Sequence, residues 1–65
     1  MKITLNKTTH EVQPGATLAD AIALLQPQAP YAVAVNMQFV PNTRYAQTPL
    51  QPDDDIEVIF PVTGG

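Results

Sequence analysis

The chain has 65 residues, one histidine, no cysteine and only three basic residues, and its formal net charge is −3. It therefore has no disulfide framework and too few ligands for a structural zinc site. It also lacks the lysine and arginine clusters that bind nucleic acid or anionic membranes. We find no apolar run long enough to span a membrane and no signal-peptide pattern, so we expect a cytoplasmic protein. A domain this short buries only about 60% of its unfolded surface, so we expect aliphatic packing to stabilise it.

The first part of the chain predicts a β-hairpin. Residues 2–6 alternate polar and apolar side chains, which is the period of a half-buried strand with Ile3 and Leu5 facing the core. A polar turn then leads into a second strand at residues 10–13. We interpret His10 as a surface residue of that strand, because no second ligand or acid–base partner is near it in the sequence.

A short helix follows the Pro14-Gly15 break. Thr17 is expected to cap its first turn, and Asp20, three residues later, stands where the acid of a capping box belongs. One apolar stripe recurs with helical spacing and consists of Leu18, Ala21, Ile22 and Leu25. A helix this short has to pack on a sheet to persist.

The second half of the chain predicts further strands around an irregular segment. Residues 31–36 form a strand whose valines face the helix, and residues 39–40 form a short strand or extended segment. Residues 41–52 are irregular, with one helical turn and with Leu50 as the anchor to the core. Three acids then precede the last strand, and we interpret them as turn residues and a solvated charge run.

The last strand, residues 56–60, leads directly into the tail. Ile56, Val58 and Phe60 alternate with Glu57 and Ile59, so Ile59 falls on the outer face of the sheet. If the first and last strands lie side by side in the centre, one helix covers one face of a mixed sheet. We therefore predict an α+β domain with the ubiquitin-like β-grasp architecture, a mixed sheet of four to five strands with one main helix on one face.

The domain is predicted to span residues 1–60 and to continue into a flexible C-terminal tail, residues 61–65, which ends in two glycines. No nucleophile–base set, metal-ligand cluster or phosphate-binding loop is visible, so we expect no catalytic residues, no metal site and no bound cofactor. The chain has the features of a domain that presents its terminus to other proteins rather than those of an enzyme.

These features resemble the ThiS family of sulfur-carrier proteins of thiamine biosynthesis over nearly the whole length. The residues that carry the resemblance are Asn36, Val40-Pro41, Tyr45, Leu50, Asp54, Ile56 and the terminal Gly64-Gly65. The chain departs from the family pattern at Asp53, where glycine is frequent, and at Asn42, where a basic residue is frequent. Aspartate tolerates a left-handed backbone, so we expect the turn at Asp53 to be kept.

The resemblance implies that Gly65 is the site of sulfur attachment and that Gly64 lets the tail enter a partner's active site. It implies a ThiF-like partner that adenylates the Gly65 carboxylate with ATP and Mg, a cysteine desulfurase relay that supplies sulfur, and a thiocarboxylate product. A ThiG-like thiazole synthase would then receive the sulfur. The absence of cysteine agrees with this scheme, because no side chain of the chain could carry sulfur.

Partner enzymes would also need a surface to hold. We expect Phe39, Ile59 and Pro61 to form an apolar docking patch around the base of the tail. Alternative functions with the same tail are a sulfur carrier like the small subunit of molybdopterin synthase and a ubiquitin-like modifier linked to lysines of target proteins. A further alternative is an interaction module with an inert tail.

Overall fold

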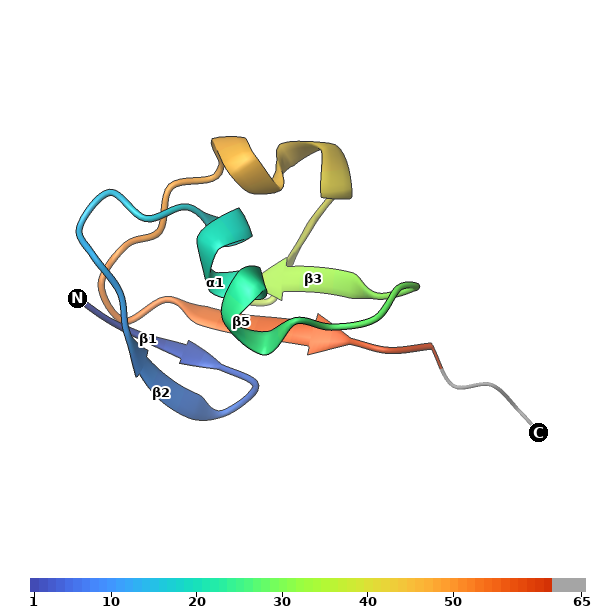
Figure 1. The fold of residues 1–65 in the computed structure, drawn as a ribbon, viewed down its shortest axis with the longest axis horizontal. Helices are drawn as coiled ribbons and strands as arrows, with labels where there is room; N and C mark the ends of the chain where they lie inside the picture. Colours follow the sequence, from blue (N-terminus) through green and yellow to red (C-terminus); the bar gives the residue numbers. More distant parts are fainter. Residues whose placement is uncertain (62–65) are drawn as a thin grey trace.

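The computed structural model describes residues 1–61 and has five strands, one α-helix and one 3₁₀ helix (Figure 1). The elements are β1 (Lys2–Leu5), β2 (Thr8–Glu11), α1 (Leu18–Leu25), β3 (Ala32–Val35), β4 (Gln38–Val40), η1 (Asn42–Gln47) and β5 (Asp55–Ile59). The strands form one sheet in the order β2-β1-β5-β3-β4. The central pair β1 and β5 is parallel, and the other neighbours are antiparallel. This is the ubiquitin-like β-grasp that the sequence predicted.

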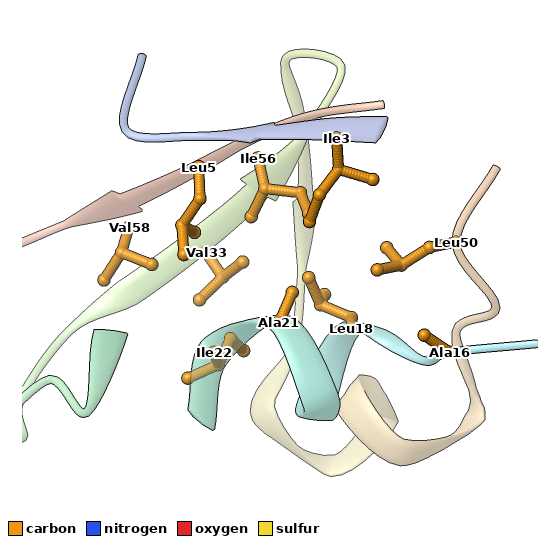
Figure 2. Packing of buried hydrophobic residues seen from close by; sticks show 10 residues of the cluster. All are labelled: Ile3, Leu5, Ala16, Leu18, Ala21, Ile22, Val33, Leu50, Ile56 and Val58. Carbon is orange, nitrogen blue, oxygen red and sulfur yellow. The ribbon is translucent and has the colours of Figure 1, made fainter. Parts of the chain in front are cut away.

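One hydrophobic core lies between the sheet and α1 (Figure 2). The inward positions of β1, β3 and β5 meet the buried side of the helix, and Leu50 enters from the segment after η1. The largest of the fully buried side chains are Ile3, Leu5, Leu18, Val33 and Ile56. The predicted anchor at Leu50 is therefore confirmed, and so are the predicted inward positions Ile3, Leu5, Val33, Ile56 and Val58.

The helix begins as predicted. Thr17 accepts a hydrogen bond from the backbone N–H of Asp20, and the Asp20 carboxylate accepts one from the backbone N–H of Thr17 at 2.9 Å. This capping box satisfies donors that the first helical turn would otherwise leave unpaired. Leu25 was placed in the buried stripe, but it is 38% exposed, because α1 ends there at a left-handed Gln26 and leaves the sheet.

Two asparagines begin the two hairpin turns of the sheet. Asn6 and Lys7 both have positive φ, and so do Asn36 and Met37. Two residues of this kind make the tight turn whose twist matches that of the flanking strands, and asparagine tolerates the left-handed backbone. Because the first turn needs only two residues, β2 begins at Thr8, two residues earlier than the sequence predicted.

The same asparagine side chains complete the hydrogen bonding of β5. The Asn6 Oδ1 atom accepts a bond from the backbone N–H of Val58 at 2.8 Å, where β1 has turned away. On the other side, the Asn36 Oδ1 atom accepts one from the backbone N–H of Asp55 at 2.9 Å. The central strand therefore keeps bonded neighbours beyond the ends of the strands beside it.

Asp54 has a structural role that the sequence reading missed. It was interpreted as part of a solvated acidic run, but it is only 8% exposed. Its carboxylate accepts bonds from the Asn36 side-chain amide at 2.9 Å and from the backbone N–H of Gln51 at 2.8 Å. Asp53 beside it is exposed and adopts the left-handed conformation predicted for it, with φ of 68°. The start of β5 is thus tied to the β3–β4 turn.

We expect Asn36→Gly to lower the free energy of unfolding by about 1–3 kcal/mol, because glycine keeps the positive φ but leaves Asp54 and the N–H of Asp55 without their partner. Met37→Gly is the matched control, since Met37 also has positive φ and its side chain is 88% exposed. Urea denaturation of both variants measures the difference. Equal destabilisation by the two changes would contradict this role of the Asn36 side chain.

Candidate functional site

The candidate site is the base of the tail, where β5 ends. The structure describes Ile59, Phe60 and Pro61 there, whereas Gly64 and Gly65, the predicted site of sulfur attachment, lie outside the described residues. The end of β5 points away from the N-terminus, and the start of β3 lies beside it (Figure 1). The chain therefore leaves the sheet at the end formed by the last residue of β5 and the first residue of β3.

The outer face of the sheet at this end carries two of the predicted docking residues. Ala32 pairs with Ile59, and Ala34 pairs with Phe39. Paired residues share a face, and so do residues two apart on one strand, so all four side chains lie on the same face. Phe39 is 69% exposed and Ile59 is 50% exposed, with only the two small alanines between them.

We call these four residues, Ala32, Ala34, Phe39 and Ile59, the outer patch. Its border toward the centre of the sheet is acidic, because Glu57 pairs with Ala34 on the same face. Pro61, the third predicted docking residue, is exposed and lies outside β5, two positions beyond Ile59. The chain itself, rather than a cross-strand pair, brings Pro61 close to the outer patch.

Phe60 departs from the prediction. The alternation of β5 placed it in the core with Ile56 and Val58, but its side chain is 48% exposed. It lies edge-on against Tyr31, with ring centroids 6.4 Å apart and an interplanar angle of 61°. Both residues stand one position beyond the last pair of β3 and β5, Ala32 and Ile59. The core does not reach this far along the strand.

Tyr31 is supported in turn by Tyr45. Their rings are stacked, with centroids 6.4 Å apart and an interplanar angle of 14°. Tyr45 belongs to η1, so three segments contribute one aromatic residue each to a row that ends at the tail; we call Tyr45, Tyr31 and Phe60 the aromatic row. Burial raises the pKa of the Tyr45 phenol above 10.0, and the neighbouring Tyr31 adds to the increase.

Sequence reasoning named two of the four residues of the outer patch, Phe39 and Ile59, but missed the aromatic row. Only Tyr45 was singled out, and only through the family resemblance. The missing signal was that Tyr31 precedes β3 just as Phe60 follows β5, so an antiparallel pairing of those strands would bring the two rings together. The third member could not be inferred, because η1 packs by tertiary contacts that no period reveals.

The other candidate residues make no site within the part of the chain that the structure describes. His10 lies on β2, paired with Ile3, and is half-buried rather than fully on the surface. Among residues 1–61 no three histidine or acidic side chains are grouped so as to hold a metal ion. No helix formed by those residues is long and apolar enough to cross a membrane.

The architecture and the tail base define a small ubiquitin-like β-grasp protein. A solved structure of the thiamine biosynthesis protein ThiS from Geobacter metallireducens has the same fold, with a TM-score of 0.80, 17% sequence identity and 100% of each chain covered. No curated protein sequence matches the chain at a significant level. The family model of the ThiS family matches residues 2–65, and the chain therefore belongs to the ThiS family.

The raised pKa of Tyr45 predicts a loss of stability in alkali. Between the phenol pKa of the unfolded chain, about 10, and the higher folded value, only the unfolded chain releases the proton, so the free energy of unfolding falls as pH rises. Tyr45→Phe should remove this contribution, and Tyr31→Phe should bring the Tyr45 pKa closer to its ordinary value. Phenolate absorbance and urea denaturation at several alkaline pH values measure both effects. Ionisation of Tyr45 at an ordinary pKa would contradict the prediction.

Proposed function

We propose that the protein is a sulfur carrier for thiazole formation in thiamine biosynthesis, with sulfur held as a thiocarboxylate on Gly65. The observation that carries this proposal is the family match, which continues without a break from the folded domain to residue 65 and so includes Gly64-Gly65. The fold supports it further, because the central strand β5 runs directly into the tail. A group on Gly65 is thereby joined through the chain to a strand that pairs with neighbours on both sides.

The proposed chemistry starts with activation of the terminal carboxylate. Its oxygen attacks the α-phosphorus of ATP on a ThiF-like partner that binds Mg²⁺, and pyrophosphate leaves. The acyl-adenylate is a far better electrophile than the carboxylate, because AMP is a good leaving group and oxide is not. The protein itself contributes the carboxylate and a chain narrow enough to enter the partner, since glycine has no Cβ.

Sulfur is transferred in two further steps. A persulfide sulfur, supplied by a cysteine desulfurase relay, attacks the acyl carbon and displaces AMP to give an acyl disulfide. A second thiol of the partner system then attacks the disulfide, which leaves the thiocarboxylate on Gly65 and forms a new disulfide between the two thiols. The thiocarboxylate sulfur is nucleophilic and is passed to a carbonyl compound on a ThiG-like synthase.

The outer patch is proposed as the surface that these partners hold, together with Pro61. Exposed apolar side chains that cluster on one face are typical of protein contacts. Phe39 and Ile59 are two large exposed apolar side chains, and only the small side chains of Ala32 and Ala34 lie between them. Because β5 carries both Ile59 and the tail, a partner bound here has the tail within its reach.

The proposal predicts a definite change in mass. The chain purified from cells that also contain its adenylating partner and the sulfur source should gain the mass of one sulfur minus one oxygen. A chain that lacks Gly65 is the control and should show no gain. An unmodified wild-type chain beside demonstrably active partners would overturn the sulfur-carrier function, and high-molecular-weight conjugates would indicate a protein modifier instead.

Ile59→Asp should weaken loading while the fold is retained. Ile59 is 50% exposed on the outer patch, so a charge there disturbs a partner contact more than it disturbs the core. Leu24→Asp is the matched control, because Leu24 is 53% exposed but lies on α1, away from the outer face of the sheet. The KM for the carrier should rise about tenfold in Ile59→Asp if one buried apolar contact of about 1.4 kcal/mol is lost. Equal KM values for the two variants would count against the outer patch.

A further inference from the structure

The last part of β5 is held from one side only. The Asn6 side chain takes the N–H of Val58, and β1 has already ended at Leu5. Beyond that point the described residues of β5 pair with β3 alone, through Ala32 and Ile59. The next contact along the described chain is that of Phe60 with Tyr31.

Pro61 limits how the chain can pair directly after Phe60. Pro61 has no backbone N–H to donate to a neighbouring strand, and its ring restricts φ. The course of the described chain at Pro61 therefore follows from the position of Phe60, the residue before it. That position depends on Tyr31, whose ring is stacked on Tyr45 of η1.

Phe60 is more exposed than core packing requires, whereas Tyr31 and Tyr45 are partly buried against the core. Phe60 is 48% exposed, and a hollow of about 290 Å³, lined by Ala29, Pro30, Tyr31, Asn42 and Tyr45, adjoins the other two rings. Core burial accounts for part of the packing of Tyr31 and Tyr45, but it does not account for the half-exposed ring of Phe60 against Tyr31. The ring contacts of the aromatic row connect η1, the start of β3 and the end of β5.

We propose that the aromatic row is a positioning device for the tail, and that Tyr31 and Phe60 are positioning residues for the adenylation of Gly65. This inference rests on the proposed function. The row aims the chain at Pro61, so that the terminal carboxylate reaches the attacking position in the partner once the domain has bound. Reactions of this kind are sensitive to small errors in placement. The outer patch and the aromatic row therefore have separate tasks, binding and aiming.

The two tasks predict different kinetic effects. The assay measures pyrophosphate release by the ThiF-like partner at varied carrier concentration. Phe60→Ala and Tyr31→Leu should lower kcat about tenfold with little change in KM. The reason is that a misplacement of about 1 Å can lower a reaction rate by up to a hundredfold. Phe39→Ala on the outer patch is the matched control and should raise KM instead. Tyr31→Phe keeps the ring and should retain the wild-type kcat.

A double-mutant cycle tests whether the two residues act as one unit. The Tyr31→Leu/Phe60→Ala variant should lose less kcat than the product of the two single losses, because either change alone already breaks the contact. Thermal denaturation of each variant checks that it is folded at the assay temperature. If Phe60→Ala is unfolded, the kcat of Tyr31→Leu alone tests the positioning role. An effect on KM alone, an unchanged kcat, or independent effects of the two changes would overturn the positioning role. Absence of pyrophosphate release with the wild-type chain would overturn the proposed function itself.

Discussion

The pairing of β5 on both of its sides is the constraint on which the rest of the structure depends. Its parallel bonds to β1 and its antiparallel bonds to β3 place the last strand of the chain in the middle of the sheet. Asn6 and Asn36 extend this pairing where the neighbouring strands turn away. The inward residues Ile56 and Val58 then bury against the helix. Core, turns and tail are thus connected through one strand.

Much of this fold follows from local patterns. The alternation around Ile3 and Leu5 and the capping pair Thr17 and Asp20 depend on residues a few positions apart, so the sequence reveals them directly. Asp54 and Phe60 were misplaced because their surroundings are non-local. The Asp54 carboxylate is hydrogen-bonded to the side-chain amide of Asn36, 18 residues away. Phe60 continues the inward alternation of β5 but is 48% exposed, because it lies beyond the part of the sheet that the helix covers. The periodicity of the sequence predicts neither the burial of Asp54 nor the exposure of Phe60.

The resemblance to the ThiS family also has a physical explanation at two of its positions. Asn36 and Asp54 bond to each other and tie the β3–β4 turn to the start of β5. They are thus requirements of the fold, and a match at these positions reports the architecture rather than sulfur chemistry. Carriers of sulfur for thiamine and for molybdopterin could share them equally. What distinguishes such proteins must therefore lie elsewhere, and the surface proposed here for partner contacts is the outer patch with its acidic border at Glu57.

The central place of β5 has a mechanical consequence. A pull along the axis of this strand is opposed by its hydrogen bonds to β1 and β3, which lie across that direction. Such a force acts on all of these bonds together, in shear, instead of opening them one after another as it would when peeling an edge strand. Ile59 and Phe60 are held on the β3 side only, through the pair with Ala32 and the contact with Tyr31, so this short segment shares the load among fewer contacts.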